Sequence, residues 1–332
     1  MNAETEQTTS AVPPIWRPAD PERTAGQIAA IRDLARRKNA VILAHNYQLP
    51  EVQEAADFVG DSLGLALQAR DTKASLIVFC GVHFMAESAR ILNPDKTVLL
   101  PSLAAGCALA DSITPESLLD WKRRYPDHTV VTYINSSAEV KALSDICCTS
   151  ANAVSVVRSL PSRRVLFTPD RNLGRWVAAQ VPDKEIVIYD GACPTHEVLR
   201  GVNVDAAKAG KPDAVVIAHP ECREDVLAMA DEICSTSGMI AAVARHPEAR
   251  TFIIATEWSL IHQLQKRYPD REFIPADGCI GCRLHCPYMK MVDLTAVQRA
   301  LVEGVFPIEV DEEDAAGARR ALERMMAVPR DC

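Results

Sequence analysis

Short apolar segments rich in valine and isoleucine recur along the whole chain. They show little alternation with polar residues, which is typical of strands buried on both faces of a parallel sheet. Helical patterns lie between them, for example over 116–126 and 259–269. Strands that alternate with helices predict an α/β fold. The expected strands are 40–45, 75–80, 97–100, 129–134, 164–167, 185–189, 214–219, 251–256 and 272–276.

Three of the expected strands end in a similar way, and their spacing indicates an internal repeat. They read VILAHNY, VVTYIN and VVIAHPE and align on His45, Tyr133 and His219, which are 88 and 86 residues apart. A hydroxyl residue follows each of these anchors by 17 residues, and an apolar residue of a second strand follows by 34. Two offsets preserved in three segments are difficult to obtain by chance, so we predict three homologous α/β domains of about 85 residues.

Three like α/β domains with parallel sheets, arranged around a pseudo-threefold axis, would point the carboxyl ends of their strands at one another. A flexible N-terminal tail is expected over 1–21. The three domains are expected over 22–104, 105–191 and 192–289, and the C-terminal segment 290–332 is expected to pack back on the first of them.

The hydroxyl residues of the repeat lie in short polar clusters where a helix is expected to begin. Serine and threonine are good N-caps, so capping alone is one explanation of their recurrence. Binding is the other, because a helix N-terminus favours carboxylate and phosphate groups. This second explanation implies a small anionic substrate. The residues are Ser62, Ser150 and Thr236.

Each anchor is followed by a second polar side chain two positions later. Such pairs share one face of an extended strand. Imidazole, phenol and carboxyl groups around one pocket can carry protons and form hydrogen bonds with a substrate. A single histidine at a strand end is most often structural, but recurrence in three domains favours binding. The pairs are His45 with Tyr47, Tyr133 with Asn135, and His219 with Glu221.

The third strand of each unit runs into a cysteine. Cys107 follows the first and Cys193 the second, while the third leads into GCIGCRLHCPYMKM, which contains Cys279, Cys282 and Cys286. Ligands of parallel α/β sheets lie beyond the carboxyl ends of the strands, so three such domains would bring one cysteine each to a common centre. Three thiolates with one open position suit either zinc or an iron–sulfur cluster.

Charge and apolar distribution exclude several classes of protein. The net charge of −8 argues against a nucleic-acid partner, because phosphate binding depends on an excess of lysine and arginine. No apolar run approaches the roughly 20 residues needed to span a bilayer, and the N-terminus lacks a signal-peptide pattern. We expect a cytoplasmic protein without a membrane partner. Its eleven cysteines would then be metal ligands, reactive thiols or buried thiols rather than disulfides.

Eight segments occur in an order that is specific although each alone is a weak signal. They are ILAHNYQLPEVQEAADFVGDSLGLA, AGCALAD, VTYINSSAEVKA, CTSANAV, CPTHE, AHPEC, STSGM and CPYMKM. With these segments the sequence resembles the quinolinate synthases of the NadA type, enzymes of bacterial NAD biosynthesis, and the match that runs from the first segment to the last covers nearly the whole chain. The resemblance implies three αβα domains around one 4Fe-4S cluster, which three cysteines hold and whose fourth iron is open to substrate.

The resemblance also implies a reaction and a set of site residues. Iminoaspartate, with L-aspartate oxidase as its supplier, condenses with dihydroxyacetone phosphate to quinolinate, phosphate and water, and the open iron acts as a Lewis acid. The implied cluster ligands are Cys107, Cys193 and Cys286. Proton transfers are assigned to Tyr47, His196 and Glu221, with Glu221 as the base. The implied substrate-binding residues are His45, Ser62, Tyr133, Asn135, Ser150, His219, Glu221 and Thr236.

Repeat spacing and resemblance favour different third ligands. Cys279 follows its anchor by 60 residues, as Cys193 does, whereas Cys107 follows by 62, so the spacing is not strict. The resemblance favours Cys286, because the family's cluster cysteine precedes a pattern like PYMKM, and loops tolerate insertions better than ligands tolerate replacement. Cys279 and Cys282 would then form an accessory redox-sensitive pair, or remain two idle loop thiols.

Two other functions remain open from the sequence. A 4Fe-4S hydro-lyase acting on a small hydroxy acid would share the open iron but gives no reason for a phosphate site. A ferredoxin-like electron-transfer site or a zinc knuckle at 279–286 would fit the local cysteine spacing. The hypothesis of a local electron-transfer or zinc site leaves Cys107, Cys193 and the repeated polar residues unexplained.

Overall fold

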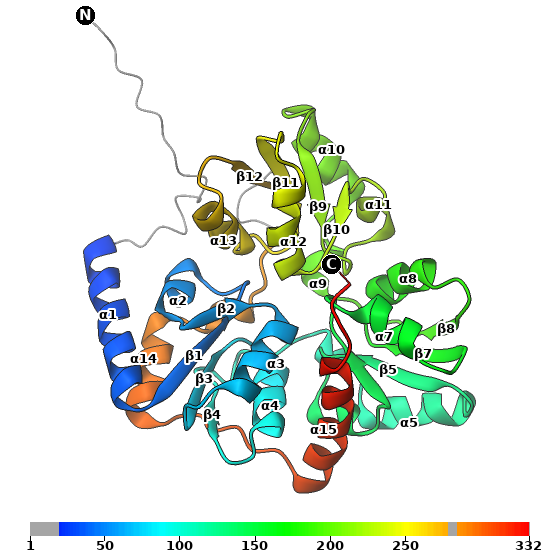
Figure 1. Cartoon of the computed structure of the whole chain (residues 1–332), viewed down its shortest axis with the longest axis horizontal. Helices are drawn as coiled ribbons and strands as arrows, with labels where there is room; N and C mark the ends of the chain where they lie inside the picture. Colours follow the sequence, from blue (N-terminus) through cyan, green and yellow to red (C-terminus); the bar gives the residue numbers. More distant parts are fainter. Residues whose placement is uncertain (1–19, 278–283, 332) are drawn as a thin grey trace, which may run out of the picture.

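The computed structural model describes residues 20–277 and 284–331. Within these residues, twelve strands form three separate four-stranded sheets, which surround a common centre (Figure 1). All strand pairs within the sheets are parallel. The strands are β1 (Ala40–His45), β2 (Phe58–Gly60), β3 (Leu76–Cys80), β4 (Thr97–Leu99), β5 (Thr129–Tyr133), β6 (Ile146–Cys148), β7 (Arg164–Thr168), β8 (Glu185–Ile188), β9 (Val215–Ala218), β10 (Glu232–Ile233), β11 (Thr251–Ala255) and β12 (Glu272–Pro275).

Helices alternate with the strands, as the sequence predicts. They are α1 (Pro21–Arg37), α2 (Pro50–Ala55), α3 (Ser62–Asp71), α4 (His83–Leu92), α5 (Pro115–Arg124), α6 (Ala138–Ala142), α7 (Ala153–Ser159), α8 (Arg171–Gln180), α9 (Pro194–Glu197), α10 (Gly201–Ala209), α11 (Glu224–Leu227), α12 (Thr236–Ala242), α13 (Leu260–Arg267), α14 (Leu294–Glu303) and α15 (Glu312–Met326). Short 3₁₀ turns cover Ala110–Ser112, Val243–Arg245 and Met289–Met291. No helix of the described residues combines the length and the apolar composition that crossing a membrane requires.

The three sheets have the same strand order, which confirms the predicted class of three α/β units. The orders are β2-β1-β3-β4, β6-β5-β7-β8 and β10-β9-β11-β12. In each unit, the first strand that the repeat predicts (β1, β5 or β9) therefore lies in the middle of its sheet. β1 and β5 end at their anchor residues, and β9 ends one residue before its anchor. The domain boundaries proposed from the sequence stay a prediction.

Three strands were not predicted from the sequence. β2, β6 and β10 are two or three residues long and lie at one edge of their sheets. Segments this short contain too few residues for an apolar pattern to stand out from the neighbouring loops. Each of them precedes the polar cluster that holds a hydroxyl residue of the repeat.

The repeat also predicts an apolar residue 34 positions after each anchor. These residues occupy equivalent positions in the first two sheets, but in the third sheet the equivalent position is one residue later. Phe79 and Phe167 each pair with the residue two positions before the anchor of their unit. Ile253 pairs with the residue three positions before its anchor. Ile254 is therefore the structural counterpart of the two phenylalanines.

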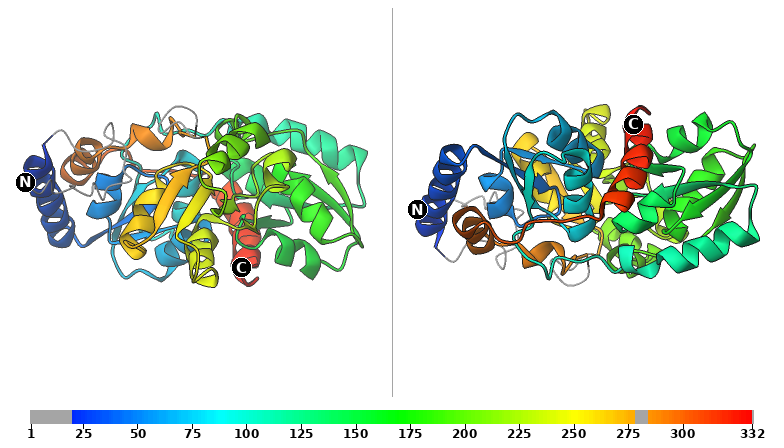
Figure 2. Two further views of the ribbon diagram at one scale, coloured as in Figure 1. Left: turned by 90° about the horizontal axis from the view of Figure 1, so that it is seen from above. Right: turned by 90° about the horizontal axis from the view of Figure 1, so that it is seen from below.

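The residues after the third sheet pack on two different units. α14 lies against α1, α2 and β3 of the first unit, whereas α15 lies mainly against α6 and β6 of the second unit and also contacts α4 of the first. Figure 2 shows α15 between these two units. α15 therefore joins the first and second units, in addition to the packing on the first unit that the sequence predicts for this segment.

Gly317 allows α15 to approach α6 closely. A Cβ atom at this position would lie 2.9 Å from the Ala142 Cα and from the Ala142 carbonyl oxygen. Replacing Gly317 by alanine should therefore lower the free energy of unfolding by about 1–3 kcal/mol, although alanine is the better helix former. Chemical denaturation measures the effect.

Gly26→Ala in α1 is the matched control, because no atom lies within 4 Å of the Cβ that it would add. This change should leave stability unchanged or raise it by about 0.5–1 kcal/mol. A Gly317→Ala protein as stable as the control would show that the two helices can separate without cost.

Candidate active site

The carboxyl ends of the strands in all three sheets face one central cavity. All thirteen residues that the sequence assigns to binding, catalysis or the cluster line it, and they come from strand ends, loops and short helices of the three units. They are His45, Tyr47, Ser62, Cys107, Tyr133, Asn135, Ser150, Cys193, His196, His219, Glu221, Thr236 and Cys286.

One cysteine that follows the last strand of each sheet reaches the cavity. Cys107 lies in the loop after β4, Cys193 directly precedes α9, and Cys286 lies in the segment between β12 and α14. All three are free thiols and partly buried. Burial raises the pKa of each thiol, to about 12 for Cys107. The thiols are therefore protonated at neutral pH unless a cation displaces the protons.

The three sulfur atoms do not all lie within 4.8 Å of one another. Among the described residues, Cys193, His196 and Glu221 are the group of potential ligands whose atoms lie within 4.8 Å of one another, and the three cysteines do not form such a group. Two thiolates on one tetrahedral zinc ion would lie about 3.8 Å apart. As placed, the three sulfur atoms fit a polynuclear cluster better than a mononuclear ion.

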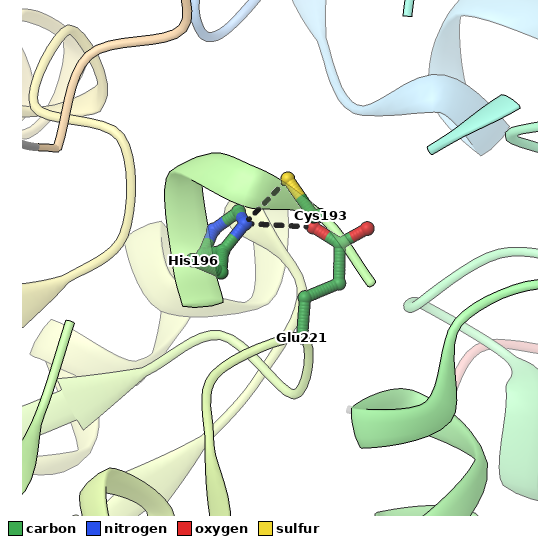
Figure 3. Close-up of side chains that lie close together, drawn as sticks. All are labelled: Cys193, His196 and Glu221. Atoms are coloured by element: carbon green, nitrogen blue, oxygen red, sulfur yellow. Dashed lines mark hydrogen bonds and ion pairs between the residues drawn. The ribbon is translucent and has the colours of Figure 1, made fainter. Parts of the chain in front are cut away.

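His196 lies between a cysteine and a carboxylate (Figure 3). Its Nδ1 atom is 3.0 Å from Glu221 Oε2 and 3.3 Å from Cys193 Sγ. His219 stacks on the His196 ring at 4.9 Å, and its Nδ1 is 3.4 Å from the same Glu221 oxygen. Burial opposes ionisation of Glu221, but the contacts with His196 and, to a smaller extent, His219 outweigh it and hold the pKa of this carboxyl well below its usual range.

A chain of hydrogen bonds connects His196 to a tyrosine on the other side of the cavity. His196 Nε2 is 2.8 Å from Thr256 Oγ1, and the same hydroxyl is bonded to Tyr47 Oη. Burial, followed by the charge of Glu221, raises the pKa of Tyr47 well above its usual range. Tyr47, Thr256, His196 and Glu221 thus form a continuous path along which a proton can move.

The two anchor histidines are held in the same way in the first and third units. Nδ1 of His45 accepts a hydrogen bond from the Tyr47 backbone at 3.1 Å, and Nδ1 of His219 accepts one from the Glu221 backbone at 3.4 Å. When neutral, each ring then carries its proton on Nε2. His219 can use this proton to bind Ser150 Oγ, 3.1 Å away. Burial lowers the pKa of both rings, to about 4 for His45, so they act as neutral donors.

The polar residues two positions after each anchor line the cavity, but they do not lie on the strands as the sequence predicted. β1 and β5 end at His45 and Tyr133, and β9 ends one residue before His219. Tyr47, Asn135 and Glu221 therefore lie in turns beyond the strands. The explanation from alternating faces of an extended strand is wrong, and the turns bring these side chains back toward the cavity.

Capping does not explain the repeated hydroxyl residues. Ser62 and Thr236 are the first residues of α3 and α12, and the capping side chains are those of the preceding residues, Asp61 and Ser235. Ser150 lies three residues before α7 begins. All three hydroxyl residues line the cavity, where they can bind the oxygen atoms of a ligand.

Two buried carboxylates that the sequence did not reveal hold the cysteine loops. Asp170 and Glu257 lie two residues beyond β7 and β11, each of which is the third of the four strands that the structure shows in its unit. Asp170 Oδ2 accepts a hydrogen bond from the Cys193 backbone at 3.1 Å, and Glu257 Oε1 accepts one from the Cys286 backbone at 3.4 Å. Their common position after the third strand is the signal that could have identified them.

Thr256 and Lys290 were also missed. Lys290 is buried and lies 2.8 Å from Glu257 Oε1, and its ammonium donates to the Ser259 hydroxyl at 2.6 Å and to the Tyr47 carbonyl. It is the lysine of CPYMKM, so the motif contained a signal for it. Cys279 and Cys282 lie outside the described residues.

Comparison with known proteins gives a consistent result. The family model for Quinolinate synthetase A protein matches residues 29–327. A quinolinate synthase from Geobacter metallireducens is 54% identical over 301 residues, which cover 91% of this chain and 97% of the relative. Another from Thermodesulfovibrio yellowstonii is 48% identical over 306 residues, or 92% of this chain and 98% of the relative.

Proposed function

The chain belongs to the quinolinate synthetase A family, and on this basis we propose that it condenses iminoaspartate with dihydroxyacetone phosphate to form quinolinate, phosphate and water. The family resemblance predicted from the sequence is confirmed. The reaction involves no net redox change, so it requires acid–base chemistry and polarisation of the substrates rather than an electron carrier.

One observation carries the proposal: each of three similar units contributes a cysteine, a strand-end anchor and a hydroxyl residue to the same cavity. The sulfur atoms form no disulfides and do not all lie within 4.8 Å of one another. This donor set fits a 4Fe-4S cluster held by Cys107, Cys193 and Cys286. When bound, the cluster would supply an open iron that acts as a Lewis acid on a substrate oxygen or nitrogen.

Proton transfer is assigned to the path from Tyr47 to Glu221. The low pKa of Glu221 makes its carboxylate alone a weak base, but His196 lies 3.0 Å away and can hold a proton beside it. The accepting unit is therefore the Glu221–His196 pair. Thr256 connects this pair to the Tyr47 hydroxyl, which can return the proton to a leaving oxygen.

Substrate binding is assigned to the neutral donors and hydroxyl groups of the lining. Ser62, Ser150 and Thr236 would bind carboxylate or phosphate oxygens. His45, Tyr133 and His219 would donate hydrogen bonds near the reacting carbons. Asn135 Oδ1 is buried and has no hydrogen-bond partner within the described part of the chain, so it is available to a substrate amine.

The supply of substrate and the compartment follow from the same proposal. Iminoaspartate is unstable in water, so an amino-acid oxidase of the L-aspartate oxidase type would have to provide it. All these reactants are small molecules of the cytoplasm, where we place the protein.

The two alternatives from the sequence have less support. A hydro-lyase acting on a small hydroxy acid would share the open iron, but it gives no reason for a phosphate site. An electron-transfer or zinc site confined to 279–286 leaves Cys107 and Cys193 without a role, although both line the cavity with Cys286.

Protein prepared without oxygen should contain about four irons and four sulfides per chain, because each unit provides one ligand. The same preparation should form quinolinate from the two named substrates. Iron and sulfide analysis followed by a product assay tests both points. Stoichiometric zinc without sulfide would contradict the cluster, and a cluster without quinolinate formation would contradict the reaction.

A further inference from the structure

Each carboxylate that lines the cavity has a basic partner. Glu221 lies against His196 at 3.0 Å, and Glu257 lies against Lys290 at 2.8 Å. Both pairs are formed by residues of the site or its motifs. The third carboxylate, Asp61, is different, because its partner Arg330 comes from the end of the described chain.

Arg330 binds both oxygens of Asp61. Nη1 donates to Oδ2 at 2.6 Å and Nη2 donates to Oδ1 at 2.9 Å, a geometry that gives strong, directional pairing. The carboxylate is almost fully buried, whereas about a third of the Arg330 side chain is exposed. Burial opposes ionisation of Asp61, but Arg330 outweighs it and lowers the pKa of the carboxyl. Asp61 is therefore charged at neutral pH.

Asp61 lies at the junction of two of the hydroxyl sites. Its Oδ1 caps α3 through the Gly64 backbone at 2.8 Å, directly before Ser62. Its Oδ2 is 3.4 Å from the hydroxyl of Ser235, the residue before Thr236. A negative charge here would repel a phosphate or carboxylate bound by either hydroxyl site unless a cation balances it.

The residue next to Arg330 is fixed to the remaining hydroxyl site. Both oxygens of Asp331 accept hydrogen bonds from the first turn of α7, from Val154 at 3.0 Å and Ser155 at 2.8 Å, and its backbone N–H donates to Ala151 at 2.7 Å. After α15 the chain thus runs to the centre of the molecule, close to α12 in Figure 1. Two consecutive residues contact the starts of α3 and α7, and through Asp61 also that of α12.

We propose that Arg330 is a positioning residue that neutralises Asp61 and thereby allows the cavity to bind an anionic substrate group at Ser62 and Thr236. This inference rests on the proposed function. Arg330 itself does not line the cavity, so it acts through Asp61. Asp331 holds it in place by binding α7.

The test compares anion binding by variants of this pair. Arg330→Gln should weaken binding of inorganic phosphate and of quinolinate by about tenfold or more, because an uncompensated carboxylate remains beside the bound anion. Titration calorimetry on the cluster-containing protein measures both affinities. In steady-state kinetics of Arg330→Gln, KM for dihydroxyacetone phosphate should rise by about the same factor as the anion affinity falls, while kcat changes less than about threefold.

The double variant Asp61→Asn/Arg330→Gln separates neutralisation from structural support. Asparagine is as good an N-cap as aspartate, so the cap of α3 is kept while the charge is removed. The double variant should recover most of the anion affinity that Arg330→Gln loses. Arg245→Gln is the matched control, because Arg245 also binds both oxygens of a carboxylate, that of Glu232, but neither residue lines the cavity.

Failure of the inference differs from failure of the proposed function. If wild-type protein binds neither anion and forms no quinolinate, the function is wrong. If wild-type protein binds them and Arg330→Gln binds equally well, or if the double variant stays as weak as Arg330→Gln, the neutralising role is wrong. Should Arg330→Gln not fold, the comparison of the double variant with wild type still decides, because equal affinity supports the role and a tenfold loss contradicts it.

Discussion

Serine in place of Cys286 should abolish both iron–sulfur content and quinolinate formation. The same loss is expected for Cys107→Ser and Cys193→Ser, because each is the one cavity cysteine of its unit in the described chain. A serine hydroxyl is a far weaker ligand for iron than a thiolate. Cluster content, measured by iron and sulfide analysis under anaerobic conditions, should fall with activity.

Cys279→Ser and Cys282→Ser are the controls, and both should keep cluster and activity. The contacts of Glu257 favour this outcome. Glu257 bonds to the Cys286 backbone as Asp170 bonds to the Cys193 backbone, and both carboxylates follow the same strand of their unit. Loss of the cluster in Cys279→Ser alone would show that the third ligand is the cysteine 60 residues after its anchor, and not the cysteine whose backbone binds Glu257.

Glutamine in place of Glu221 should reduce turnover by about 10²–10⁴-fold while the cluster is retained. The amide keeps the shape of the side chain but cannot accept a proton next to His196. Cluster content should stay near wild type because Glu221 is not among the proposed ligands. Turnover under saturating substrate, with iron analysis of the same sample, provides the measurement.

Glu197→Gln is the matched control for this change. Glu197 lies next to His196 in sequence and is bound by Arg171, Asn172 and Arg223, but it does not line the cavity. Its replacement should leave turnover within about threefold of wild type. Near-normal turnover of the Glu221→Gln protein would remove Glu221 from the mechanism.

Much of the site could be predicted because the repeat constrains it three times. A histidine or tyrosine at the end of one strand carries little information, but three equivalent strand ends indicate a shared cavity. His45, Tyr133 and His219 were found in this way, and so were the hydroxyl residues that follow them. The same reasoning located Cys107 and Cys193, because parallel strands of like units end at the same face.

Other residues could not be predicted because their roles depend on contacts between distant segments. Arg330 is 269 positions from Asp61, and no local pattern connects them. Thr256 joins Tyr47 to His196 only after the first and third units meet. The turns that redirect Tyr47 and Glu221 into the cavity are likewise set by tertiary packing, which a strand pattern does not encode.

The late position of α15 and Arg330 has a consequence for how the protein is made. Chains are synthesised from the N-terminus, and units that fold independently can do so before the chain is complete. All three sheets end by residue 275, whereas α15 begins at residue 312. A nascent chain can therefore contain three folded sheets while the first and second units still lack the helix that joins them and Asp61 still lacks its arginine. α15 and Arg330, which follow all three sheets in the sequence, thus complete the pocket.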